Sequence, residues 1–413
     1  MTVPFIEGRP FAEALRKAKS EKKNVLLDIY AVWCAPCKLM DRTTFSDKAV
    51  GEFARTTFVS VKMDAEKGEG RRLAQRYMIS SFPTVLVLDP SGNEIDRMVG
   101  VYPATSFLTS VRAILAGQTP LLLGLAALKK QWSPREAAAL AQDLIRRHDV
   151  ARLRPIVVRL VSEDADLGGP DAAFHLLTLL AALEDFDGKL NAETADLVAT
   201  MLPRAGADPR RGALALLLSR DQLRRGETAA AKATAVKTLE AIGDSAPYAA
   251  ELWAAVGAAE RKAGRADAAV AACRKAVALS ESGNAAGATR GERQMDLADA
   301  LVSAGKASEA RAAMEAGLER WGNDPKAFVR ASKIALALKS PPEAVAHARR
   351  AVALSQGEDA SSQAALAAAL TATGDASGAA AAWRRAAEID PENVEYRRGA
   401  GPAPAKKPAA GAP

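Results

Sequence analysis

Two cysteines separated by two residues are the most chemically informative feature of this 413-residue sequence. Cys34 and Cys37 enclose Ala35-Pro36, a spacing found in redox-active dithiols and in one half of a zinc site. A closed zinc site needs four ligands, and the remaining cysteine, Cys273, and the three histidines all lie far along the chain. The spacing therefore favours a dithiol that carries out thiol–disulfide exchange, with no metal.

The position of Cys34 predicts that it is the attacking thiol. It precedes a predicted helix that runs to about Thr44, so unpaired amides and the helix dipole would stabilise its thiolate. Pro36 suits the first helical turn because no amide hydrogen is needed there. Cys37, one turn further on, is expected to be more buried and to act as the resolving thiol. Because Ala35-Pro36 carries no charge, we expect only a moderately lowered pKa for Cys34, which favours a reductase.

Around the cysteines, helix and strand patterns alternate over residues 1–117. The predicted helices are Arg9–Lys23, Lys48–Arg55 behind an Asp47 cap, Glu69–Tyr77 and one after Pro103. The predicted strands are Asn24–Ala31, Phe58–Met63, Thr84–Leu88 and Glu94–Val99. Helices that separate strands indicate an α/β domain whose sheet is covered on both faces.

The motifs of this domain resemble those of the thioredoxin family. The run from Asp28 to Lys38 is similar to the family's active-site pattern, and Ser81-Phe82-Pro83-Thr84 is similar to its cis-proline loop. The runs 43–47 and 61–64 resemble more closely the thioredoxin-like domain of membrane disulfide reductases. The resemblance implies a thioredoxin fold over about residues 5–117.

The resemblance also implies roles for individual residues. Cys34 corresponds to the family's nucleophile and Cys37 to its resolving cysteine. Asp28 corresponds to a buried carboxylate that helps proton transfer at the second cysteine, and Lys62 corresponds to a lysine near that carboxylate. The redox-active disulfide Cys34–Cys37 would then be the redox group, with no further cofactor and no metal.

Substrate contacts are implied for Trp33, Phe82 and Pro83, with Ala35 and Pro36 in support. Pro83 is expected to be cis, which places its backbone beside Cys34, where a substrate strand can pair. Phe82 stands where smaller β-branched residues are usual, and Tyr30 replaces a frequent tryptophan. Both departures bear on substrate preference rather than on the chemistry.

From residue 118 the sequence predicts helices alone. Residues 118–211 read as degenerate helical hairpins, with helices at Leu121–Lys130, Pro134–His148, Val150–Val161, Asp171–Glu184 and Ala192–Leu202. In residues 212–395 a repeat follows, whose turn residues are Gly226, Gly264, Gly305, Lys339 and Gly374. An alanine lies five residues after each turn and a small residue twelve after, where two helices of a hairpin must pack closely.

This pattern resembles the tetratricopeptide repeat over about residues 212–391. The resemblance implies an all-α solenoid, a right-handed superhelix whose groove binds a protein or peptide. The one long interval between turns is interpreted as an insertion at Asn284–Arg290. Cys273 falls at an inward packing position and is interpreted as a small core residue. The tail, residues 396–413, is expected to be disordered.

Charge and hydropathy exclude other partner classes. The net charge is +7, but the long middle region has no basic excess, which argues against a nucleic-acid partner. The best apolar stretch, Thr119–Leu128, is shorter than the ~20 residues of a membrane span, so we expect none. The N-terminus lacks an apolar signal core, which predicts a cytoplasmic protein, or an extracytoplasmic one if a leader has been removed.

The sequence thus predicts a thiol–disulfide oxidoreductase, a protein disulfide reductase whose repeats recruit a protein partner. Such an enzyme needs a disulfide-bearing protein substrate and an electron-donor reductase. One alternative is a repeat scaffold or co-chaperone with an incidental redox domain, and another is an exported disulfide oxidase or isomerase. The presence of Cys34, Cys37, Asp28 and Pro83 together favours the first, since a scaffold needs none of them.

Overall fold

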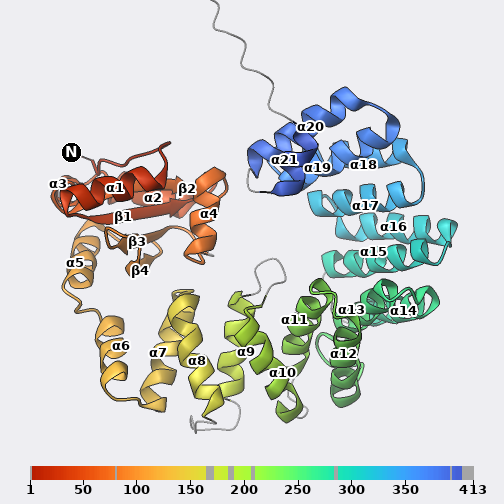
Figure 1. The fold of residues 1–413 in the computed structure, drawn as a ribbon, viewed down its shortest axis with the longest axis horizontal. Coiled ribbons are helices and arrows are strands. Elements are labelled where there is room, and N and C mark those ends of the chain that lie inside the picture. Colours follow the sequence, from red (N-terminus) through yellow and green to blue (C-terminus); the bar gives the residue numbers. More distant parts are fainter. Residues whose placement is uncertain are drawn as a thin grey trace, which may run out of the picture. The chain divides into compact units, whose positions relative to one another are not determined.

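The computed structural model describes residues 2–79, 81–163, 172–184, 190–205, 210–282, 287–390 and 393–401. Contacts divide the chain into two compact units, Met1–Arg204 and Ala205–Pro413. The first unit contains an α/β domain and the helices that follow it, and the second contains helices (Figure 1). The predicted boundary at residue 117 lies inside the first unit.

Four strands form the sheet of the first unit, in the order β2-β1-β3-β4. They are β1 Asn24–Tyr30, β2 Phe58–Asp64, β3 Thr84–Leu88 and β4 Glu94–Val99. β1 runs parallel to β2 and antiparallel to β3, and β4 is an edge strand antiparallel to β3. In this register Asp28 of β1 lies between Lys62 of β2 and Val85 of β3. The predicted strands are confirmed to within one residue.

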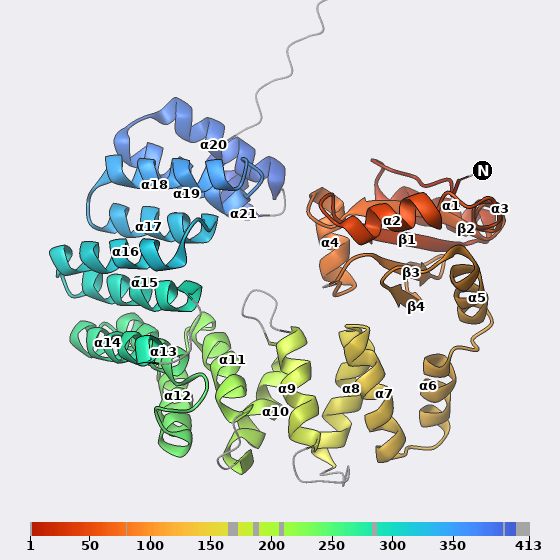
Figure 2. The same ribbon diagram turned by 180° about the vertical axis from the view of Figure 1, so that it is seen from behind.

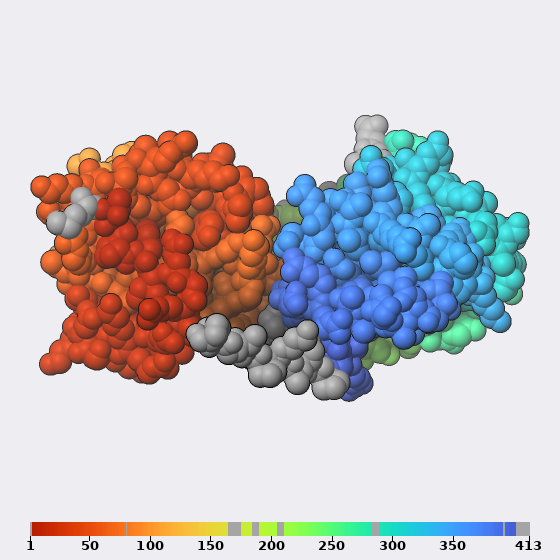
Figure 3. Space-filling view, turned by 90° about the horizontal axis from the view of Figure 1, so that it is seen from above, coloured from red at the N-terminus to blue at the C-terminus, as the bar shows by residue number. Residues whose placement is uncertain are grey.

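Helices cover both faces of this sheet, as predicted. They are α1 Phe11–Glu21, α2 Ala35–Thr43, α3 Lys48–Thr57, α4 Gly68–Arg76 and α5 Ala104–Leu115. Leu27 packs with residues of α1 and α4 in one core, and Leu26 packs with residues of α2, α3 and α5 in the other. The two cores follow from the alternation of side chains along β1. Figure 3 shows the residues of this domain from above, in red and orange.

Five further α-helices complete the described part of the first unit. They are α6 Pro120–Lys130, α7 Pro134–Arg146, α8 Val150–Ser162, α9 Ala172–Glu184 and α10 Ala192–Met201. By length and composition alone, one described segment, 104–130, is apolar and long enough to cross a membrane. This segment consists of α5 and α6, and α5 buries Phe107, Val111 and Ile114 in the sheet domain.

The second unit consists of helical hairpins (Figure 2). The pairs are α11 Arg210–Arg224 with α12 Thr228–Ile242, α13 Ala249–Lys262 with α14 Ala266–Ser282, α15 Gly287–Ser303 with α16 Ala307–Trp321, α17 Pro325–Ala337 with α18 Pro341–Leu354, and α19 Ala360–Thr373 with α20 Ala376–Ile389. Every predicted turn residue has a left-handed backbone, including Lys339 at φ 58°. The alanines five positions later are at most 5% exposed. The predicted repeat is therefore confirmed at both positions.

Two details of the second unit differ from expectation. The long interval between Gly264 and Gly305 contains two 17-residue helices, α14 and α15. Residues 287–290 of the predicted insertion belong to α15. Residues 283–286 lie outside the described residues. Residues 396–400 of the predicted tail lie in the helix α21, Val394–Ala400, where Gly399 packs against Trp383. The tail beyond residue 401 lies outside the described residues.

Cys273 lies in the core of the repeats. It is 2% exposed, and a Cβ at Gly257 would come within 2.4 Å of its Sγ. Burial raises the pKa of the Cys273 thiol to about 12. It therefore packs as a small apolar residue, as predicted, and forms little thiolate at neutral pH.

Candidate redox site

The N-terminus of α2 positions the two cysteines. Cys34 is the N-cap of this helix, and its Sγ accepts a hydrogen bond from the Cys37 amide at 3.1 Å. Pro36 occupies the first helical turn, where its missing amide leaves no bond unmade. Cys34 and Cys37 form a disulfide. The unpaired amides of the helix start thus point towards Cys34, as the sequence predicts.

The burial of the two cysteines differs from the prediction. Cys34 is 2% exposed and Cys37 is 3% exposed, so Cys37 is not the more buried of the two. The reason is that the disulfide packs against Ala31, with Tyr30 and Phe82 beside it. In this oxidised form the surroundings shield both sulfur atoms alike.

An aromatic pair stands beside the disulfide. Trp33 is 66% exposed, and its ring meets the ring of Phe82 edge-on at 6.1 Å between centroids. The indole Nε1 donates to Glu66 Oε1 at 2.8 Å, which ties this exposed side chain to the segment after β2. No local sequence pattern indicates Glu66, because it lies 33 residues from Trp33.

The loop before β3 contains the expected cis bond, between Phe82 and Pro83. The Pro83 carbonyl accepts from the Gly100 amide at 2.9 Å, which anchors the loop to the residue after β4. Phe82 is in contact with the cysteine cluster. The structure therefore brings the three predicted substrate-contact residues, Trp33, Phe82 and Pro83, to one place with the disulfide.

A buried ion pair lies under α2. Asp28 is 1% exposed, and its Oδ2 is 3.2 Å from Lys62 Nζ, as expected from the resemblance. Its other oxygen, Oδ1, is buried without a hydrogen-bond partner. Lys62 also pairs with Asp41, which lies on α2 one turn after Cys37. Asp41 was not among the predicted site residues, although its position four residues after Cys37 places it on the same face of the helix.

Burial and charge shift the protonation of this pair. Burial raises the pKa of Asp28 to about 6, although the charge of Lys62 opposes this. Burial alone would lower the pKa of Lys62, but Asp28 and Asp41 together outweigh it and raise that pKa. Asp28 consequently changes protonation near pH 6 while Lys62 remains charged. A carboxyl group with such a pKa can exchange a proton with a thiol at neutral pH.

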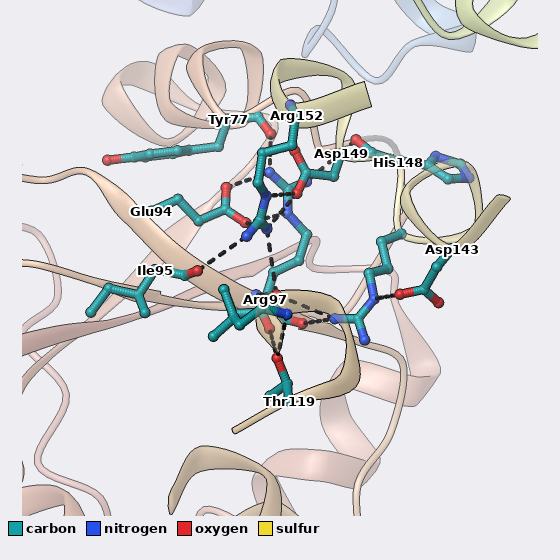
Figure 4. A network of polar contacts seen from close by, with 12 residues as sticks. Tyr77, Glu94, Ile95, Arg97, Thr119, Asp143, His148, Asp149 and Arg152 are labelled. Carbon is teal, nitrogen blue, oxygen red and sulfur yellow. Dashed lines mark hydrogen bonds and ion pairs between the residues drawn. The ribbon is translucent and has the colours of Figure 1, made fainter. Parts of the chain in front are cut away.

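A second buried polar cluster joins the sheet to the helices of the first unit (Figure 4). Asp96 and Arg97 of β4 are 0% and 2% exposed. Arg152 of α8 donates to the Ile95 carbonyl and Arg147, at the end of α7, donates to the Arg97 carbonyl, both at 3.1 Å. These arginines satisfy backbone groups of the edge strand that would otherwise be open to another strand. The α/β domain and α7–α8 are thus joined through buried charges.

Among the described residues, no group of three or more His, Cys, Asp or Glu side chains is placed to hold a metal ion.

The α/β domain matches known proteins in sequence. A family model described as a thioredoxin-like domain matches residues 11–115. The thiol:disulfide interchange protein DsbD of Ralstonia nicotianae is 35% identical over 105 residues, 25% of this chain and 17% of that protein. The protein of the same name from Yersinia pestis is 36% identical over 94 residues, 22% of this chain and 16% of that protein. The chain thus spans about a sixth of the length of these relatives.

The helical part matches a solved structure. A tetratricopeptide repeat protein from Parabacteroides merdae superposes with a TM-score of 0.50, over 65% of this chain and 97% of that one, at 13% identity. This likeness concerns the fold alone. The predicted fold class, a thioredoxin-like α/β domain followed by a tetratricopeptide-repeat solenoid, is therefore confirmed. The N-terminal domain is thioredoxin-like and carries a cysteine pair with the spacing of a redox site.

Proposed function

We propose that this protein is a thiol–disulfide oxidoreductase that reduces disulfides in other proteins. The observation that carries the proposal is the Cys34–Cys37 pair at the start of α2, next to the buried Asp28–Lys62 pair. A helix N-terminus favours a thiolate at Cys34, and the buried carboxyl group can take up a proton. The similarity of residues 11–115 to thiol:disulfide interchange proteins supports the same chemistry.

The reaction begins from the reduced dithiol. The Cys34 thiolate attacks one sulfur of the substrate disulfide, a mixed disulfide forms, and the other substrate sulfur leaves as a thiolate. The Cys37 thiol then loses its proton and attacks Cys34 Sγ, which releases the second substrate thiolate and leaves the Cys34–Cys37 disulfide. A dithiol electron donor must reduce this disulfide before the next cycle. No metal or further cofactor enters the cycle.

Asp28 is proposed to take part in the second step. Its Oδ1 makes no hydrogen bond, and its pKa of about 6 leaves it mostly ionised at neutral pH. It can therefore accept the proton of Cys37 as that thiol attacks, directly or through a water molecule. Lys62 remains charged throughout and holds the carboxylate in place.

Substrate contact is assigned to the surface around the disulfide. Trp33 provides an exposed apolar face, and Phe82-Pro83 provides a loop backbone where an extended substrate strand can pair. The repeats of the second unit would recruit a protein partner, because arrays of this kind present extended concave surfaces. Recruitment would raise the effective concentration of a disulfide held near Cys34.

The equilibrium reduction potential of the Cys34–Cys37 disulfide against glutathione tests the proposal. We expect a value nearer the roughly −270 mV of thioredoxin than the roughly −120 mV of a strong oxidant, because Ala35-Pro36 supplies no charge. A potential above about −180 mV would favour an oxidase or isomerase. A dithiol that exchanges with no disulfide would leave a repeat scaffold as the function.

A further inference from the structure

A hollow lies beside the loop that leads to Pro83, between the end of α4 and the helices α8 and α9. It is lined by Ala74, Gln75, Met78, Ile79, His148, Val150 and Leu183. Its volume is about 90 Å³. Its walls are mostly apolar, with Gln75 and His148 as polar members. Such a lining favours an apolar side chain over a charged group.

Phe82 connects the disulfide to the core residues that line the hollow. Phe82 contacts the cysteine cluster on one side and packs against the core that contains Ile79 and Ala74 on the other. Ile79 and Pro83 are four residues apart, so their Cα atoms are separated by at most ~14 Å. A polypeptide bound with its cysteine at Cys34 can therefore reach the hollow within a few residues.

One buried arginine holds the two walls of the hollow together. Arg97 donates to the Tyr77 carbonyl at the end of α4 at 2.8 Å, and to the His148 carbonyl between α7 and α8 at 3.4 Å (Figure 4). Tyr77 precedes Met78 of the lining, and His148 is itself a lining residue. Because the arginine is 2% exposed and fixed by Glu94, the walls are positioned before any ligand binds.

We infer that this hollow is a second binding site of the redox unit, which receives one apolar side chain of the disulfide-bearing polypeptide a few residues from its reacting cysteine. The inference rests on the proposed function and adds to it a preference among substrates. A small disulfide has no side chain at that distance, so it gains nothing from the hollow. A polypeptide gains the burial of one apolar side chain, which increases its rate of reaction with Cys34 by lowering the free energy of the bound state.

The test uses the full chain, reduced in advance and mixed with excess substrate, so that no electron donor is needed. The substrates are Gly/Ser-rich peptides with one cysteine in a mixed disulfide and a single leucine one to six residues from it. We expect the second-order rate constant to rise about fivefold to tenfold at one leucine spacing, relative to the peptide without leucine. Leu183→Gln and Met78→Gln should each remove this advantage and leave the rate with a small aromatic disulfide unchanged.

Leu125→Gln is the matched control. Leu125 is also a half-buried leucine that lines a hollow of the first unit, here between α6 and α8, and its substitution should preserve the leucine advantage. Equal rates for all peptides with the wild-type protein would overturn the inference, and so would an unchanged advantage in both hollow variants. Failure of the wild-type protein to reduce the small disulfide would instead overturn the proposed function. If Leu183→Gln does not fold, the leucine advantage measured with Met78→Gln alone tests the inference.

Discussion

At the scale of single residues, the site combines a helix start with a buried charge pair. Cys34 accepts the Cys37 amide as the cap of α2, while Asp28 and Lys62 lie on neighbouring strands beneath the helix. The two arrangements serve different steps of the proposed reaction, since the first favours a thiolate and the second accepts a proton. Asp41 shares Lys62 with Asp28 and so weakens the hold of Lys62 on the buried carboxylate.

The order of reactivity of the thiols is the first prediction. Alkylation of the reduced protein at mildly acidic pH should label Cys34 before Cys37, because the unpaired amides at a helix N-terminus stabilise a thiolate there. Cys37→Ser should then accumulate mixed disulfides with substrate, since the resolving thiol is gone. Mass spectrometry of the labelled peptides checks both outcomes. Cys273 serves as the internal control: labelling there first, or equal labelling of the pair, contradicts the assignment.

A second prediction concerns Asp28 and pH. Its pKa is raised from the model-compound value of 3.8 to about 6, so the folded protein holds a proton there that the unfolded chain releases. This contribution to stability is complete below about pH 4 and is lost as the pH rises to about 6. Asp28→Asn should therefore raise the free energy of unfolding by about 1–3 kcal/mol at pH 7.5 and by much less near pH 4.

Urea unfolding of the oxidised protein at the two pH values measures this effect. Asp41→Asn is the matched control, because it removes the same charge from the same lysine at a site that is 41% exposed. It should change the free energy of unfolding by less than about 1 kcal/mol. A gain for Asp28→Asn that does not depend on pH would contradict the buried-carboxyl explanation.

At the scale of elements, the folded sheet domain does not end with α5, the last helix before residue 117. Its edge strand β4 places Asp96 in the interior, where Arg147, at the end of α7, and Arg152 of α8 supply the compensating charges. Buried charges of this kind require their partners, since a charge left alone in the interior is strongly destabilising. The helices α7 and α8 therefore stabilise the redox domain, which a flexible linker would not do.

The third prediction tests this connection. Arg152→Ala removes contacts to Glu94, Asp149 and the Ile95 carbonyl, and should lower the free energy of unfolding of the first unit by about 2–4 kcal/mol. Arg146→Ala, at an exposed arginine of α7 that pairs with Asp143, should cost less than about 1 kcal/mol. Thermal unfolding of the two variants side by side measures the difference. Equal losses would mean that the buried cluster contributes no more than a surface pair.

A fourth prediction concerns the turns between the repeat helices. Lys339 occupies the left-handed position that glycine holds in the other four turns, at φ 58°. A side chain there is strained, so Lys339→Gly should stabilise the second unit by up to about 1 kcal/mol. Gly374→Ala makes the reverse change at an equivalent turn and should destabilise by a similar amount. Denaturant unfolding followed by helix content measures both, and a loss for Lys339→Gly would refute the explanation.

At the scale of the whole molecule, the proposed division of labour places chemistry in the first unit and recruitment in the second. The first unit holds the disulfide, the buried ion pair and the network of Figure 4, all before residue 205. The second unit holds five helical hairpins, and its one cysteine, Cys273, is buried in their core. A fragment that ends at residue 204 keeps the first unit whole. A fragment that ends at residue 117 lacks Arg147 and Arg152, the partners of Asp96.

The fifth prediction follows from that division. A fragment of residues 1–204 should unfold cooperatively and reduce insulin nearly as well as the full chain. A fragment of residues 1–117 should be several kcal/mol less stable, because the buried Asp96 loses Arg147, Arg152 and Thr119. Towards the physiological partner, loss of the repeats should reduce activity by up to ~10²-fold, since the effective concentration falls. A folded 1–204 fragment that is inactive on insulin would show that the repeats complete the active site.

The local features could be predicted from the sequence. Short β-branched and apolar runs located the four strands, the spacing of Cys34 and Cys37 located the dithiol, and the recurring Gly–Ala pattern located the hairpins, because each depends on neighbours within a few residues. Apart from the Asp28–Lys62 pair, which the family resemblance implied, contacts between distant side chains became known only from the tertiary structure. Glu66 reaches Trp33, Asp41 shares Lys62, and Arg152 reaches β4 across separations of 21 to 57 residues. Such pairings depend on how the elements pack, and no local pattern in one sequence encodes that packing.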